Sequence, residues 1–229
     1  MFHRSEWVEV KTPSSTAKKT KKRKSNTVAD SSVCARVATS NGHRQLRAGD
    51  LAEVVQNEQM QRKDKPNMLL LINEDLFGND EDLFVAGMAY IGMGIGVFST
   101  FRYALDFRVA SPDSYWFDCS HAKELQWAYS TELIRRLGRL GAHELLHLFG
   151  VLHCIDYSCM MNGSGHLEED LRQPLLLCPI DLYKIASVFG FHKHADLLEL
   201  YMKPLYRKLE ELGLSPESQQ VKKMIETLT

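Results

Sequence analysis

Three histidines and one glutamate lie close together in the segment His143-Glu144-Leu-Leu-His147-Leu-Phe-Gly150-Val-Leu-His153. On a helix with about 3.6 residues per turn, His143 and His147 lie one turn apart on one face, so two imidazole nitrogens can converge on one ion. Gly150 can adopt the left-handed conformation that ends a helix and returns the chain, which brings in His153 as a third ligand. Three neutral ligands leave the fourth position of a zinc ion open to water, as in catalytic sites rather than closed structural ones.

The same spacing predicts the reaction. Glu144 lies roughly 100° round the helix from His143, beside the metal. Zinc lowers the pKa of a bound water to about 7 and polarises a scissile carbonyl, while a neighbouring carboxylate accepts the water's proton and passes it to the leaving amine. We therefore expect hydrolysis, with Glu144 as the general base.

A chance occurrence of the pattern is the alternative, because histidines on helices are commonly exposed or packed and H-E-x-x-H arises in unrelated proteins. Gly150 and His153 add two further identities at fixed offsets, which disfavours chance. The longer pattern is the metzincin signature, and the segment resembles the zinc site of that group of proteins.

The residues after the third histidine narrow this resemblance. Cys154 follows that histidine directly, Cys159-Met160 forms a second pair, and Cys178 comes later. From about Met68 to Gly190 the chain resembles the archaemetzincins, whose motif is HExxHxxGxxHC followed by a Cys-Met pair and a CxxC. The resemblance implies a zinc metallopeptidase with aminopeptidase-like activity, with Met160 in the turn under the catalytic zinc and four cysteines around a second zinc.

The chain departs from this family at the last cysteine of the CxxC, where it has Asp181. An aspartate oxygen binds zinc at about 2.0 to 2.2 Å, although thiolate is the softer and commoner ligand in closed sites. His166 or Cys119 could also supply the fourth ligand. The alternative is that no residue supplies a fourth ligand, in which case the cysteines are small buried residues or form a disulfide, and the second site is lost. The candidate ligands of a second zinc are Cys154, Cys159, Cys178 and Asp181.

Composition fits a single globular enzyme domain. The chain has 229 residues, 44% of them hydrophobic, and a net charge of -1, which predicts no overall attraction to nucleic acid or to anionic membranes. Its apolar runs are too short to span a bilayer or to form a secretory signal. Five cysteines, an odd number, favour a reducing compartment. We expect a monomer that acts on peptides or proteins in the cytoplasm or the nucleus.

The sequence divides into three parts. Residues 1–40 are expected to form a basic, disordered tail, because the run Lys18-Lys-Thr-Lys-Lys-Arg-Lys24 repels itself. This run is typical of a solvated tail, and it also resembles a nuclear-localisation or phosphate-binding patch. Residues 41–213 are expected to form a metzincin-like catalytic domain, and residues 214–229 a short helical extension.

The predicted fold is of the α/β (α+β) class, with a small, mixed, twisted sheet packed on a central zinc-binding helix and a helical C-terminal part. The motif helix is expected to begin near Ser130 or Thr131 and to end at Phe149. Its Gly138 and Gly141 suggest close packing against a neighbour. Met68 to Ile72 reads as a central strand. The other predicted elements are a helix from Leu46 to Gln61 with Met60 on its inner side, strands at 84–91 and 95–103 joined by a tight glycine turn, and helices at 181–189, 195–212 and from Ser215.

Family likeness places the strand near Gly87 to Ile91 at the upper rim of a cleft, where a peptide could bind by adding a strand. Two other functions stay open. A zinc-binding scaffold without peptidase activity has no need of Glu144 beside the metal. A nucleic-acid-binding zinc module would suit the basic run and the cysteines, but the missing fourth cysteine and the near-zero net charge disfavour it.

Overall fold

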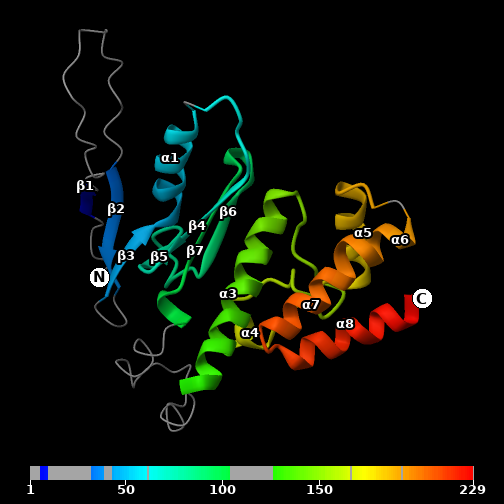
Figure 1. The fold of residues 1–229 in the computed structure, drawn as a ribbon. Helices are drawn as coiled ribbons and strands as arrows, with labels where there is room; N and C mark the ends of the chain where they lie inside the picture. The colour runs from blue at the N-terminus through cyan, green and yellow to red at the C-terminus, as the bar shows by residue number, and fades with distance from the viewer. Residues whose placement is uncertain are drawn as a thin grey trace, which may run out of the picture.

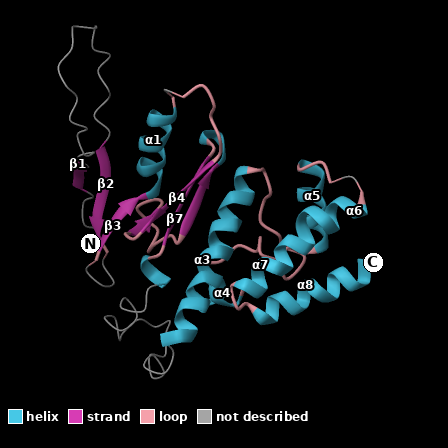
Figure 2. Cartoon of the chain, in the orientation of Figure 1, coloured by secondary structure: helices cyan, strands magenta, loops and turns pink. Residues whose placement is uncertain are grey.

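The protein is described by a computed structural model that covers residues 6–9, 32–38, 43–60, 62–103, 126–165, 167–191 and 193–228. The strands gather in one half of the molecule together with α1, whereas the later helices form the other half (Figure 1). Helix α3 stands between the two halves, as the colouring by secondary structure makes clear (Figure 2). This arrangement confirms the predicted α/β class with a central helix and a helical C-terminal part.

The strands form two small sheets. In the first, β1 and β2 and then β2 and β3 pair antiparallel, and β3 and β5 pair parallel. In the second, β7 pairs parallel with β4 and antiparallel with β6. Both sheets are mixed, as predicted, but the prediction was of a single sheet. The strands are β1 (Glu6–Glu9), β2 (Ser32–Val37), β3 (Arg44–Arg47), β4 (Met68–Ile72), β5 (Asp75–Phe77), β6 (Gly87–Tyr90) and β7 (Ile95–Ser99).

The position predicted for β4 is wrong, because β7 is the central strand of its sheet and β4 lies at an edge. All five residues of β7 are buried, whereas Leu71 of β4 is 52% exposed. Leu69 of β4 packs with residues of α3, and Leu70 and Ile72 pack with residues of α1. Both faces of β4 are thus covered by helices, so its sequence is apolar throughout although it has one strand neighbour.

Helix α1 (Ala48–Gln59) covers one face of the second sheet and α3 (Gln126–Leu148) covers the other. Met60, predicted to face inward, is 66% exposed because α1 ends one residue earlier. Gly141 does approach a neighbour closely, since a Cβ there would lie 3.1 Å from Phe98 Cζ. Among the described residues, no atom lies within 4 Å of a Cβ on Gly138, so the packing reason predicted for Gly138 finds no support there.

The ends of α3 differ in how well the sequence predicted them. The helix begins at Gln126, several residues before the predicted cap at Ser130 or Thr131, because serine and threonine also occur inside helices. It ends at Leu148, and Gly150 has a φ of 84°. This positive φ is the left-handed conformation that the motif predicted, and it turns the chain back under the helix.

The C-terminal half is built from helices that pack around one apolar cluster. The predicted helix from Ala195 to Leu212 consists of α6, a π-helical turn (Leu198–Met202) and α7, with Pro204 in the first turn of α7. Within the described residues, no helix is long and apolar enough to cross a membrane. The helices are α4 (Leu167–Arg172), α5 (Pro179–Val188), α6 (His194–Leu197), α7 (Lys203–Glu211) and α8 (Ser215–Leu228).

The folded part of the chain begins before residue 41. In β2, Val33 and Ala35 are buried against Leu46 of β3 and Ala52 of α1. The first sheet therefore includes residues from the range 1–40, which was predicted to form a tail. The basic run at residues 18–24 lies outside the described residues, so its predicted character stays a prediction. At the other end, Val221 of the predicted extension is buried in the C-terminal cluster.

A buried ion pair joins the first sheet to the chain that follows β7. The guanidinium of Arg102 donates to both carboxylate oxygens of Asp75, over 2.8 and 2.7 Å, and Gln45 Nε2 donates to the same carboxylate over 2.9 Å. Asp75 is 1% exposed. The pair is bidentate and shielded from water, so its loss should be costly.

We expect Asp75→Ala to lower the free energy of unfolding by about 3 to 5 kcal/mol, because the carboxylate that neutralises a buried guanidinium is removed. Urea unfolding followed by circular dichroism measures the change. Asp80→Ala is the control, since Asp80 pairs with Arg47 at 3.4 Å but its side chain is 69% exposed. That variant should cost less than about 1 kcal/mol. Equal effects of the two substitutions would contradict a buried, stabilising pair.

Candidate metal centre and cleft

The structure brings His143, His147 and His153 together, and we call them the histidine site. One ring nitrogen from each lies within 4.8 Å of the others. His143 Nε2 and His147 Nε2 are 3.0 Å apart, and the ring centroids of the three pairs are 4.6, 5.3 and 4.8 Å apart. Two nitrogens at about 2.0 to 2.1 Å from a tetrahedral zinc would be about 3.3 Å apart, so the donor set fits the ion.

Backbone carbonyls fix the tautomers of the two helical histidines. His143 Nδ1 lies 2.9 Å from Met160 O, and His147 Nδ1 lies 2.7 Å from Val151 O. A carbonyl oxygen can only accept, so both Nδ1 atoms carry the proton and both Nε2 lone pairs remain free for a metal. Burial lowers the pKa of His143 to about 4 and lowers that of His147, which keeps the rings neutral as ligation requires.

Met160, predicted in the turn under the metal, is buried and contributes through its backbone. Its carbonyl oxygen is the acceptor for His143 Nδ1, and its N–H donates to Leu176 O over 2.9 Å. The turn is therefore tied both to the histidine site and to the segment that leads into α5. The polarity of this carbonyl sets the orientation of the first histidine ring.

Glu144 lies beside the histidine site and is buried against the second sheet. A Cβ on Gly87 of β6 would lie 2.6 Å from Glu144 Oε1, and a Cβ on Gly96 of β7 would lie 3.5 Å from Glu144 Cβ. Two glycines on adjacent strands thus leave the space that this side chain occupies. Burial raises the pKa of Glu144 to about 8, against a smaller lowering by Arg139. A cation at the histidines would favour the carboxylate and bring the pKa down again.

A pocket of about 640 Å³ opens in front of these residues. Residues of β6 and the chain before it form one wall, as predicted for the rim of a cleft. The histidine site and Glu144 form a second wall, and the chain after the Met160 turn forms a third wall. Since β6 has one strand neighbour in the described sheet, its outer edge faces this space with free backbone groups.

A buried polar network in the same pocket was not predicted from the sequence. The guanidinium of Arg139 donates to Asp170 of α4 and to the side-chain oxygen of Gln173. Asp170 also accepts from Tyr103 OH over 2.6 Å. Gln173 Nε2 in turn donates to Asn162 O over 2.8 Å, so the network ties α3 and α4 to the Met160 turn. The one sequence signal was the position of Arg139, four residues before His143 and therefore on the same helix face.

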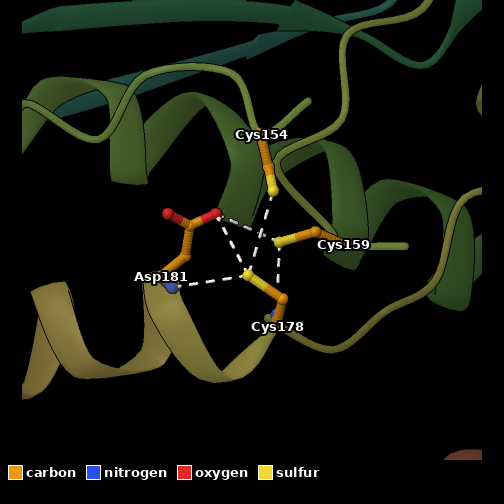
Figure 3. A group of neighbouring side chains, drawn as sticks. All are labelled: Cys154, Cys159, Cys178 and Asp181. Carbon is orange, nitrogen blue, oxygen red and sulfur yellow. Dashed lines mark hydrogen bonds between the residues drawn. The ribbon is translucent and has the colours of Figure 1, made fainter. Parts of the chain in front are cut away.

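The second predicted set of ligands also converges. Cys154 and Cys159 come from the chain after α3, Cys178 precedes α5 and Asp181 lies in its first turn (Figure 3). Their donor atoms all lie within 4.8 Å of one another. The three thiols are free. We call the group of Cys154, Cys159, Cys178 and Asp181 the cysteine cluster.

The distances within the cysteine cluster fit a tetrahedral ion. Cys154 Sγ and Cys178 Sγ are 3.9 Å apart, while Asp181 Oδ2 lies 3.2 Å from Cys159 Sγ and 3.7 Å from Cys178 Sγ. A zinc ion with Zn–S of about 2.3 Å and Zn–O of about 2.0 Å places sulfurs about 3.8 Å apart and sulfur and oxygen about 3.5 Å apart. The aspartate therefore occupies the place of a fourth ligand.

The surroundings of the cysteine cluster favour the charged form of Asp181 and the neutral form of Cys159. Asp181 Oδ1 accepts from Lys184 Nζ over 2.7 Å, which leaves Oδ2 directed at the sulfurs. Burial opposes the carboxylate, but the hydrogen bonds from Lys184 and Cys159 outweigh it and lower the pKa of Asp181. Burial raises the pKa of Cys159 to about 12, so a cation is needed to hold its thiolate. The two residues predicted as alternatives to Asp181 for the fourth ligand, His166 and Cys119, lie outside the described residues.

Comparison with known proteins finds similarity to archaemetzincins. Archaemetzincin-2 of Homo sapiens is 32% identical over 193 residues, which are 77% of this chain and 49% of that protein. Archaemetzincin-2 of Mus musculus is 37% identical over 131 residues, or 52% of this chain and 35% of that protein. The crystal structure of an archaemetzincin from Methanopyrus kandleri has 25% identity and a TM-score of 0.44, over 64% of this chain and 67% of that one. No family model matches the sequence.

The α/β fold has two histidines and a glutamate on a central helix, and a third histidine and a buried methionine turn in the chain after it. These features define a metzincin-type protein. Within that class, the chain is related to the archaemetzincins, to which it is 32% and 37% identical over the matched residues of the human and mouse proteins. It spans about half the length, or less, of the curated relatives that it matches, 49% for the human protein and 35% for the mouse protein.

Proposed function

We propose that the protein is a zinc-dependent metallopeptidase that hydrolyses peptide bonds with aminopeptidase-like preference. The observation that carries this proposal is the meeting of three histidine nitrogens and the Glu144 carboxylate at one wall of a pocket of about 640 Å³. The opposite wall is a sheet edge with free backbone groups, which suits an extended peptide. The names of the relatives, archaemetzincin-2 of two mammals, support the same reading.

The residues of the pocket have distinct tasks in this proposal. His143, His147 and His153 would hold the zinc ion, which when bound supplies a Lewis acid for the peptide carbonyl and acidifies water. Glu144 takes the proton of the attacking water and delivers it to the leaving amine. The edge of β6 aligns the substrate backbone, and burial of Glu144 keeps bulk water from competing for its carboxylate.

We also propose that the cysteine cluster binds a second zinc ion. Three sulfurs and one aspartate oxygen lie at tetrahedral spacing, and backbone N–H groups of Met161 and Cys178 donate to Cys159 Sγ over 3.4 and 3.2 Å. Such donors stabilise a thiolate that is bound to metal. With four protein ligands this site is closed, so its part is structural rather than catalytic.

The test combines metal content with peptide cleavage. We expect about two zinc ions per purified chain if both four-ligand and three-ligand sites fill. Removal of the metal by a chelator should reduce cleavage to the uncatalysed background, and added Zn²⁺ should restore it. Peptides with a free N-terminus should be cleaved faster than the same peptides with an acetylated N-terminus, which tests the aminopeptidase-like preference.

Three results would count against these proposals. Zinc at one ion per chain would refute the second site. Equal cleavage of free and acetylated peptides would refute the aminopeptidase-like preference while leaving the peptidase intact. Full zinc content without cleavage of any peptide in a broad library would favour the alternative, a zinc-binding scaffold.

A further inference from the structure

We infer that the cysteine cluster positions the ligands of the histidine site, so that a metal bound at the cluster strengthens metal binding at the histidines. The inference rests on the proposed function, because it takes both groups as zinc sites. It concerns the chain between Val151 and Met161, which supplies ligands to both.

The first connection runs through the adjacent residues His153 and Cys154. His153 is exposed, so its ring depends for its position on the backbone that carries it. That backbone is fixed through Cys154, whose N–H donates to Met161 O over 2.8 Å and whose carbonyl accepts from Asn162 Nδ2 over 2.7 Å. The Cys154 thiol points into the cluster (Figure 3).

The second connection runs through the adjacent residues Cys159 and Met160. Cys159 is fully buried and accepts N–H donors at its sulfur from two segments of chain. Its N–H donates to Asn162 Oδ1 over 2.8 Å. The next residue, Met160, provides the carbonyl that orients His143 at 2.9 Å. A shift of Cys159 therefore moves the acceptor that sets the first histidine ring.

The hydrogen-bond contacts of the Cys154 thiol are long. Its sulfur lies 3.9 Å from both Cys178 Sγ and Tyr157 O, close to the limit for a hydrogen bond that involves sulfur. A bound ion would link Cys154 directly to Cys178 and Asp181 at the start of α5. The chain around His153 would then be ordered before the histidine site binds its own ion, which removes part of the entropic cost of that binding. Such coupling is reciprocal, so metal at the histidines must also favour metal at the cluster.

The test measures metal affinity at the histidine site when the cluster is broken from its far side. Cys178→Ser removes a cluster ligand but leaves the chain from Val151 to Met161 unchanged. Titration with Co²⁺ separates the two sites, because only the thiolates of the cluster give sulfur-to-cobalt charge-transfer absorption. We expect Cys178→Ser to lose that absorption and to weaken Co²⁺ binding at the histidines by about 5- to 150-fold, the usual range of coupling between sites.

Three further measurements separate coupling from a general loss of stability. Val33→Ala creates a cavity in the core between the first sheet and α1, which contains no ligand of either site, and it should leave the affinity of the histidine site unchanged. Asp181→Asn keeps every cysteine and the shape of the side chain. It should weaken Co²⁺ binding both at the cysteine cluster and at the histidine site, and it provides the test even if Cys178→Ser folds poorly. A double-mutant cycle with His153→Ala tests the connection through the third histidine. In the His153→Ala background, Cys178→Ser should reduce the Co²⁺ affinity by a smaller factor, because the ligand next to Cys154 is already removed.

Unchanged affinity at the histidines in both cluster variants overturns the inference but leaves the proposed function standing. Wild-type protein that binds only one Co²⁺ per chain, without charge-transfer absorption, overturns it as well. Absence of metal at the histidines in the wild type refutes the proposed function itself, so the two failures are distinguishable.

Discussion

Glu144→Gln is expected to lower kcat for peptide cleavage by about 10²- to 10⁴-fold while the zinc content stays at the wild-type value. The substitution keeps the shape of the buried side chain and removes its capacity to take up a proton. None of the three histidines is altered, so the metal should remain. Cleavage kinetics and zinc analysis on the same preparation measure both quantities.

The environment of Glu144 explains why a metal and this carboxylate belong together. Burial raises the pKa of Glu144 to about 8, so without a cation nearby much of it would be protonated at neutral pH. A protonated acid cannot act as a base. A divalent cation at the histidines favours the carboxylate by direct attraction, and the same burial then makes the carboxylate a stronger base than it would be in water.

Glu132→Gln is the matched control for this prediction. Glu132 lies on the same helix, and it pairs with Arg136 over 2.6 Å at the partly exposed end of α3, away from the pocket. It should retain wild-type cleavage. If Glu144→Gln cleaves as fast as Glu132→Gln, then Glu144 is not the base, whatever its position beside the histidines.

The parts of the site that the sequence predicted are local. His143 and His147 share a helix face because of the helical repeat, and Gly150 adopts a φ of 84° because glycine has no Cβ to oppose it. The convergence of the cysteine cluster was predicted from family resemblance, and the distances of 3.2 to 3.9 Å between its donor atoms agree with it. Spacing along the chain is sufficient for the helical motif, whereas the cysteine cluster was expected only from the resemblance.

The parts that the sequence did not predict depend on contacts between distant segments. Asp170 is the partner of Arg139, yet 31 residues separate them, and nothing in either local sequence indicates the pairing. Lys184 directs Asp181 by a bond that appears only once α5 is formed. Strand order also depends on distant contacts. A strand with a helix on each face has the same apolar sequence at the edge of a sheet as at its centre. The local sequence pattern does not determine these features, because tertiary contacts set them.

Gly87→Ala is expected to lower kcat by about 10²-fold, because misplacing a reacting group by about 1 Å costs that much. An added Cβ would lie 2.6 Å from Glu144 Oε1 and 2.9 Å from Glu144 Cδ, closer than atoms can pack. The clash meets the mobile end of a side chain rather than backbone, so the carboxylate should move while the sheet stays in place. The melting temperature and the zinc content should therefore remain at wild-type values. Steady-state kinetics should show the loss in kcat with little change in KM, since the edge of β6 that aligns the peptide is unchanged.

Gly92→Ala makes the same substitution where it should have no effect, because no atom in the described part of the chain would lie within 4 Å of a Cβ on Gly92. Replacement of glycine by alanine restricts the unfolded chain and stabilises by about 0.4 to 1 kcal/mol where the backbone permits it, so neither variant should lose activity through poorer folding. A loss confined to Gly87→Ala would then measure the displacement of Glu144. Wild-type kcat in Gly87→Ala would mean that Glu144 tolerates displacement, which is incompatible with a base that must lie within hydrogen-bond reach of the proton it removes. The absence of a side chain at Gly87 would in that case serve the close approach of the peptide to β6, and KM rather than kcat would rise in the variant.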